Sequence, residues 1–101
     1  MENNYRIIEQ YQTFVRDSAY HGRSGEEALA YYAMGLAGET GEVVEPIKKA
    51  YRDPSRVFSV EDLELELGDV LWYVTAIANH FNLKLDDIMQ KNIDKLIERH
   101  Q

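Results

Sequence analysis

The sequence predicts an all-α protein: a single domain over residues 1–101, built like a four-helix bundle and completed by oligomerisation. Apolar residues recur at helical spacing in four segments with short connections, and no segment alternates as a strand does. The third segment is apolar most of the way round, and a chain of 101 residues has limited capacity to bury its own surface. We therefore expect another copy to cover that surface, in a homodimer or a homotetramer.

The first half of the chain is expected to form two helices. The first runs roughly over 4–19, and a turn at 21–25 follows it. In that turn Ser24 lies three residues before Glu27, the spacing of a capping box, in which the two side chains satisfy the first free amide groups of a helix. The second helix should then continue to about residue 51.

The second half of the chain is expected to form two more helices. Pro46 precedes them inside the second helix, where it removes a backbone hydrogen bond and should kink or interrupt the helix. After a short polar loop, Ser59 with Asp62 should open the third helix, which runs to about residue 81. A tight turn leads to the fourth helix, which occupies roughly 85–99.

Two short acidic signatures lie 27 residues apart: Glu39 with Glu42, and Glu66 with Asp69. Within each signature the acids are three residues apart, so a helix places both on one face. Two such helices laid antiparallel would point four carboxylates into a single space. Clustered anions repel one another unless a cation lies between them, and ligands that are all oxygen select a hard cation such as Mg²⁺ or Mn²⁺.

The acids also allow other interpretations. One isolated pair of acids on a helix is usually a solvated face, and 18 acids in the chain produce such pairs by chance. A di-iron site of the ferritin-like type would need a histidine three residues after a glutamate, and none of the three histidines lies at such a place. Two pairs flanked by glycine and apolar residues therefore favour Mg²⁺ chemistry on phosphates over redox iron.

Glycines accompany the acidic signatures at Gly35, Gly38, Gly41 and Gly68. Each costs about 1 kcal/mol relative to alanine inside a helix, so their presence there calls for a reason. We expect them to let the helix backbones approach closely enough for the carboxylates to share an ion. The alternative is that they only ease ordinary helix crossings.

Composition restricts the possible partners and the compartment. The net charge of −7 argues against non-specific binding to nucleic acid and suits a protein that recruits divalent cations. The chain has no cysteine, which fits a reducing cytoplasm. Its beginning lacks the pattern of a signal sequence, and its longest apolar stretch, 70–78, is far short of the ~20 residues that span a bilayer. We expect a cytoplasmic protein that does not enter the membrane.

Several stretches carry a resemblance to a known family: Gly-Leu-Ala-Gly-Glu-Thr-Gly-Glu-Val-Val at 35–44, Ile-Lys-Lys at 47–49, Glu-Leu-Gly-Asp-Val-Leu-Trp-Tyr at 66–73 and Leu-Asp-Asp-Ile at 85–88. Together they resemble the MazG-like nucleoside triphosphate pyrophosphohydrolases. The resemblance implies an all-α fold, assembly as a dimer or as a tetramer of dimers, and hydrolysis of nucleoside triphosphates to monophosphate and pyrophosphate. Pro46 departs from the family pattern and puts the helix path there in question.

The resemblance also implies roles for the acids. It makes Glu39, Glu42, Glu66 and Asp69 the Mg²⁺ ligands and catalytic residues, with Mn²⁺ as a substitute. The metal would polarise the α-phosphoryl group and lower the pKa of a bound water. A carboxylate that is not fully used in coordination could accept the proton of that water, and the sequence leaves Glu39 and Glu42 open for this task.

Cationic and amide side chains are candidates for binding the outer phosphates. They are Lys48 and Lys49 near the end of the second helix, and Asn92, Lys95 and Arg99 along one stripe of the fourth. Cations stabilise the charge that phosphoryl transfer develops on the leaving group. The alternative is that lysines near a helix C-terminus only complement its dipole.

Base recognition has three candidates. Trp72 and Tyr73 follow Asp69 within a turn and could stack on a base, and Gln12 could hydrogen-bond a base edge. Aromatic residues at helical spacing are more often part of a core or an interface.

Two hypotheses remain. The first is a Mg²⁺-dependent nucleotide pyrophosphohydrolase that cleanses the nucleotide pool. The second is a non-catalytic helical oligomer whose acidic site binds metal structurally or serves a protein partner. The cationic stripe near the end of the fourth helix separates them, because a structural metal site has no need of it.

Overall fold

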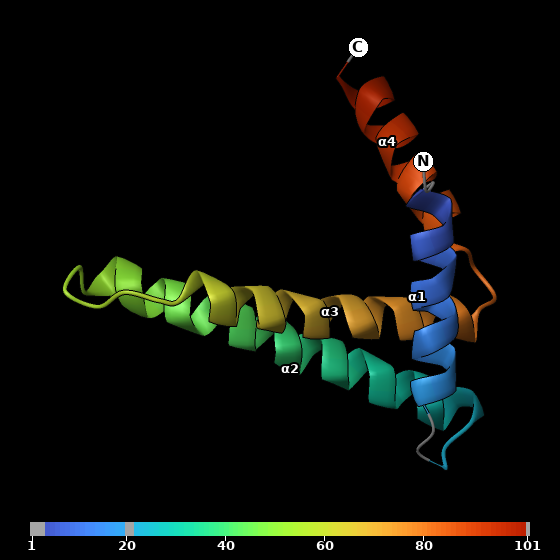
Figure 1. Ribbon diagram of the computed structural model, residues 1–101, viewed down its shortest axis with the longest axis horizontal. Helices are drawn as coiled ribbons and strands as arrows, with labels where there is room; N and C mark the ends of the chain where they lie inside the picture. Colours follow the sequence, from blue (N-terminus) through green and yellow to red (C-terminus); the bar gives the residue numbers. More distant parts are fainter. Residues whose placement is uncertain (1–3, 20–21, 101) are drawn as a thin grey trace. The chain divides into compact units, whose positions relative to one another are not determined.

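The computed structural model describes residues 4–19 and 22–100, with side chains from residue 7 onward. This part of the chain contains four helices and no strand: α1 at Asn4–Ser18, α2 at Gly25–Arg52, α3 at Val60–His80 and α4 at Leu85–Arg99 (Figure 1). The predicted all-α class is thus confirmed, and the helix bounds agree with the expected ones to within a residue. No helix among these four offers a stretch long and apolar enough to cross a membrane.

The chain divides into two compact units. One comprises residues 23–74, which contain α2 and most of α3. The other comprises residues 1–22 and 75–101, which contain α1, the end of α3 and α4. The acidic signatures both lie in the first of these, which we call the α2–α3 unit. The second is called the α1–α4 unit.

Aromatic side chains hold α2 against α3 in the α2–α3 unit, where the two helices run antiparallel (Figure 1). The ring of Tyr32 is buried and meets the ring of Trp72 edge-on, with 6.3 Å between centroids. Trp72 in turn meets Tyr73 edge-on at 5.1 Å. A Cβ added at Gly35 would collide with the Tyr73 ring. Glycine at this position is therefore what allows α2 and α3 to approach so closely.

The other three helical glycines do not share this role. A Cβ added at Gly38, Gly41 or Gly68 would meet no described atom within 4 Å. An alanine at any of the three would therefore displace no described atom. The expectation that all four glycines bring the helices together is wrong for these three and right for Gly35.

The starts of the two long helices differ. Ser24 is the N-cap of α2 in extended conformation, but its side chain makes no capping hydrogen bond, so the predicted capping box with Glu27 is wrong. At the start of α3 the backbone amide of Asp62 donates to the hydroxyl of Ser59 over 3.2 Å. The sequence signal for the start of α3 is thus confirmed, because the hydroxyl satisfies an amide group that the helix itself leaves free.

Pro46 does not interrupt α2. The helix continues through it to Arg52, and Asp53 follows as the C-cap. The proline ring holds φ near −65°, which is a helical value, and it removes only one hydrogen bond of a ladder 28 residues long. Of the predicted kink or interruption, the interruption is therefore wrong, and the loop that follows lies where the sequence indicates.

In the α1–α4 unit, the amide of Gln12 ties three segments together. Its Nε2 donates to Asn79 Oδ1 at 2.8 Å and to the carbonyl of Leu83 at 3.0 Å, and its Oε1 accepts from the backbone amide of Leu85 at 2.8 Å. Asn79 Nδ2 donates back to the carbonyl of Gln12 at 3.0 Å. Because Leu85 begins α4, the amide oxygen of Gln12 satisfies a free donor at that helix start. Gln12 is buried, as is Val15 one turn later.

Candidate active site

Three of the four signature acids meet between α2 and α3. Glu39 comes from α2, and Glu66 and Asp69 come from α3. A ligand oxygen from each of the three lies within 4.8 Å of the others. Glu39 and Glu66 are half-buried, and Asp69 is exposed. We call these residues the acidic triad.

The triad has the electrostatics of a cation site. Partial burial raises the pKa of Glu66 above its ordinary value, and the negative charges of neighbouring acids raise it further, those of Glu39, Glu42, Asp69 and Asp62 in that order. The shift has this direction because the charged form of Glu66 is partly desolvated and repelled by the acids around it. A hard divalent cation would neutralise the cluster, and an all-oxygen donor set fits it.

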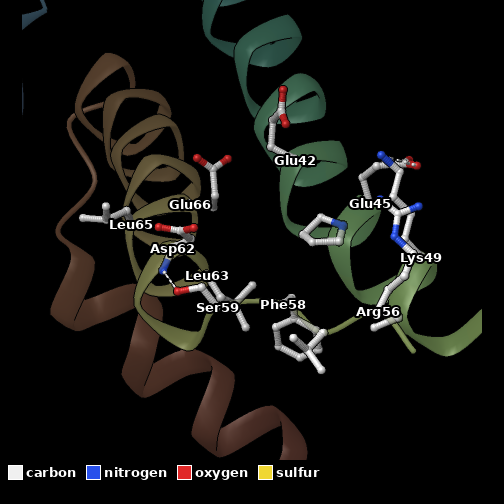
Figure 2. A pocket seen from close by; sticks show the side chains of 13 residues that line it. Glu42, Glu45, Lys49, Arg56, Phe58, Ser59, Asp62, Leu63, Leu65 and Glu66 are labelled. Atoms are coloured by element: carbon white, nitrogen blue, oxygen red, sulfur yellow. Dashed lines mark hydrogen bonds and ion pairs between the residues drawn. The ribbon is translucent and has the colours of Figure 1, made fainter. Parts of the chain in front are cut away.

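Glu42 lies apart from the triad and faces a groove (Figure 2). Figure 2 shows its side chain on α2, across the groove from Glu66 on α3. Its charge still contributes to the raised pKa of Glu66. The expectation that four carboxylates share one space therefore holds for three of them, with the fourth at the groove wall.

The groove has a volume of about 560 Å³ and lies between the second half of α2, the loop after it and the first turns of α3. Its lining residues fall within 42–50, 56–59 and 62–66. Asp62 and Glu66 stand on the α3 side, whereas Lys49 and Arg56 lie together on the other (Figure 2). Glu66 belongs to both the triad and the groove, so the two are continuous.

Comparison with known proteins decides the family. The model of the MazG nucleotide pyrophosphohydrolase domain matches residues 27–101. This chain belongs to the MazG family. It is 39% identical over 99 residues to the Gene 37 protein of Mycobacterium phage L5, a match that covers 91% of this chain and 87% of the relative. It is 27% identical over 100 residues to the phosphoribosyl-ATP pyrophosphatase of Clostridium acetobutylicum, covering 96% and 84%. No solved structure matches it significantly.

In this MazG chain the two candidates for base stacking belong to the aromatic packing. Trp72 lies between Tyr32 and Tyr73 in the edge-on contacts described above. Burial raises the pKa of Tyr73, and so do the charge of Tyr31 and a hydrogen bond with it, followed by the charges of Glu39 and Asp69. The phenol of Tyr73 thus borders the triad while its ring fills the space left by Gly35.

The predicted phosphate-binding residues are distributed over both units of the MazG chain. Lys49 lines the groove and pairs with Glu45 at 3.9 Å, whereas Lys48 is exposed and does not line it. The remaining three lie exposed along α4 in the α1–α4 unit: Asn92, Lys95 and Arg99. They are not among the residues that line the groove.

Three charged groove residues were not predicted as site residues from the sequence: Glu45, Arg56 and Asp62. Arg56 lies in the loop after α2, and Asp62 lies in the first turn of α3, where the sequence indicates only a helix start. Helical periodicity carries no information about a loop side chain. The usable signal was the Asp-Pro-Ser run at 53–55, which predicts a tight turn that brings the next residue back toward the end of α2.

Proposed function

We propose that this MazG chain, acting as a single domain over residues 1–101, is a Mg²⁺-dependent nucleoside triphosphate pyrophosphohydrolase. It would convert a ribo- or deoxynucleoside triphosphate to monophosphate and pyrophosphate, with Mn²⁺ as a substitute metal, and so cleanse the nucleotide pool. The observation that carries the proposal is the acidic triad, in which one oxygen of each acid lies within 4.8 Å of the others. The triad adjoins a groove that is also lined by the cationic side chains of Lys49 and Arg56. The match to the family and a relative named as a pyrophosphatase support it.

The proposed roles follow from the positions of the acids. Glu39, Glu66 and Asp69 would hold the metal. A bound divalent cation supplies Lewis acidity toward a phosphoryl oxygen and a lowered pKa for coordinated water. Glu42 stands outside the triad with its carboxylate facing the groove, so we assign it the acceptance of the water's proton. Glu39 was the other candidate, but it belongs to the triad.

The bond cleaved is proposed to be the α–β linkage. A triphosphate approaches this acidic surface only with divalent metal between the charges, which places one phosphoryl group beside the triad. Lys49 lines the groove beyond it and suits the departing pyrophosphate. Contacts from Lys48 and from Asn92, Lys95 and Arg99 of α4 remain part of the proposal. Base contacts from Trp72, Tyr73 and Gln12 also remain part of the proposal, and the same side chains hold the fold through contacts with other residues of the chain.

We also propose that the enzyme is a homodimer or a homotetramer. Large apolar side chains on α3 are exposed, including 70% of Leu65, 51% of Leu67 and 44% of Leu71. Gly68 between them has open space beside it. Another copy would bury this surface. Light scattering tests the assembly, and a fully active species of 11.7 kDa would contradict it.

The activity is tested by pyrophosphate release from a panel of ordinary and modified nucleoside triphosphates. Release is expected with Mg²⁺, none with EDTA, and none from an Asp69→Asn variant that keeps its helical circular dichroism. If Mg²⁺ raises the melting temperature but no member of the panel is hydrolysed, the acids form a structural metal site and the proposal is wrong.

A further inference from the structure

The end of the groove away from the triad is cationic. Figure 2 shows the side chains of Lys49 and Arg56 lying together there, Lys49 from the last turns of α2 and Arg56 from the loop. Lys49 has a carboxylate partner, Glu45, at 3.9 Å. Within residues 4–19 and 22–100, the guanidinium of Arg56 has no carboxylate at ion-pair distance. Two neighbouring positive charges with a single carboxylate partner leave one positive charge unneutralised. This favours the binding of an anion from outside the chain.

The backbone fixes Arg56 to the end of α2. The amide of Asp53 donates to the carbonyl of Lys49 at 3.0 Å, and the amide of Arg56 donates to the carbonyl of Asp53 at 2.9 Å. The carboxylate of Asp53 closes the turn, because its Oδ1 accepts from the amide of Ser55 at 3.1 Å and from the Ser55 hydroxyl at 2.7 Å. The turn therefore holds the backbone of Arg56 next to the last turn of α2, which carries Lys49.

The charges of the groove specify which anion fits. Four acids and two cations line it, so the lining carries an excess of negative charge that a divalent metal at the acids would reduce. With metal bound, one end is a metal site and the other is a guanidinium with an ammonium group. A chain of phosphates, bridging metal and cations, matches this order. A guanidinium also binds phosphate oxygens through paired hydrogen bonds, which an ammonium group cannot do.

We propose that Arg56 binds the distal phosphates of the nucleoside triphosphate, so that the triphosphate lies along the groove from the acidic triad to the loop after α2. This rests on the proposed function and extends it, because it defines the direction of the substrate. A nucleoside monophosphate bound at the triad would leave Arg56 without a contact.

The test measures binding with Mg²⁺ present, by calorimetry with inorganic pyrophosphate and with nucleoside monophosphate, alongside KM for the best triphosphate of the panel. Arg56→Gln should weaken pyrophosphate binding and raise KM by about tenfold or more, the usual effect of losing a charged hydrogen bond. Its affinity for monophosphate should stay within about twofold of wild type. Arg56→Lys should recover part of the loss. Removal of Mg²⁺ should abolish pyrophosphate binding in every variant.

Arg52→Gln is the matched control, because Arg52 is an exposed arginine in the last turn of α2 that does not line the groove. It should leave all three measurements unchanged. Unchanged pyrophosphate affinity in Arg56→Gln would overturn the inference, as would an equal loss of monophosphate affinity. Either result in an active wild-type enzyme leaves the proposed function standing. A wild-type protein that hydrolyses no triphosphate overturns both.

Discussion

The two ends of the α2–α3 unit differ in how closely the helices approach. At one end Tyr32 is buried against Trp72, and the ring of Tyr73 occupies the space that a side chain at position 35 would need. At the other end the helices enclose an open groove of about 560 Å³. The acidic triad lies at the junction: Glu39 follows Gly35 by four residues, and Asp69 precedes Tyr73 by four.

This difference explains why two acid pairs of similar spacing behave differently. Close packing one turn away holds Glu39 within 4.8 Å of both Glu66 and Asp69. One turn further toward the groove, Glu42 does not belong to this group and lines the groove instead. The close aromatic packing thus lies one turn from the mutually repelling acids, and the open end leaves room for a ligand. Repulsion among clustered acids lowers the stability of the folded chain, and such a loss of stability is typical of a functional site.

The largest effect is expected from changes at the junction. Glu66→Gln removes a charge shared by the triad and the groove, so it should lower kcat by about 10³-fold or more, as loss of a group acting directly on the transition state does. Its affinity for Mn²⁺, measured by the loss of the free-ion paramagnetic resonance signal, should fall in parallel. Glu64→Gln, an exposed acid on the same helix outside the groove, should behave as wild type. Full activity in Glu66→Gln would remove the triad from the mechanism.

A smaller effect is expected from closing the gap at the aromatic end. Gly35→Ala forces its methyl group against the Tyr73 ring and should lower the free energy of unfolding by about 1–3 kcal/mol, the usual cost of overpacking. Gly38→Ala places the same methyl group in open space and should raise it by up to about 1 kcal/mol through helix propensity. Denaturant titration of the two variants measures both values. Equal effects would show that the close approach at Gly35 is not what holds the helices.

The smallest effect concerns pH in the metal-free protein. The pKa of Glu66 is raised in the folded state above its ordinary value of 4.5. The folded protein therefore holds this proton more tightly than the unfolded chain. The resulting stabilisation is complete below pH 4.5 and disappears as the pH rises through the folded pKa. In EDTA, acidification should thus raise the melting temperature of wild type relative to Glu66→Gln. Saturating Mg²⁺ should cancel this trend, and a trend of the opposite sign in EDTA would contradict the repulsion described here.

Much of the fold could be predicted from the sequence because helices depend on local patterns. Apolar periodicity located all four helices, and the hydroxyl of Ser59 marked the start of α3 as it does in the structure. Two local signals misled for the same reason. Ser24 has the residue type of a capping box without the bond, and Pro46 has the residue type of a helix breaker inside a helix that continues. In both cases the sequence signal concerns the gain or loss of a single hydrogen bond. The remaining contacts of a long helix outweigh the free energy of that one bond.

The site could be predicted only as far as helical spacing determines it. Spacing brought Glu39, Glu66 and Asp69 to one place, but it could not show that Glu42 would face the groove. That depends on where the aromatic packing ends. Spacing likewise could not reveal Arg56, whose position depends on loop hydrogen bonds around Asp53. The pairing of Gln12 with residues more than 60 positions away was equally invisible in the sequence.

We propose that the acidic triad supports cleavage of a triphosphate between its α and β phosphorus atoms. Phosphorus-31 NMR during hydrolysis by the Mg²⁺-loaded wild-type protein tests it most directly, because each product has its own resonance. We predict that nucleoside monophosphate and pyrophosphate appear in equal amounts from the first spectrum, with no orthophosphate. Early orthophosphate together with nucleoside diphosphate would contradict the claim.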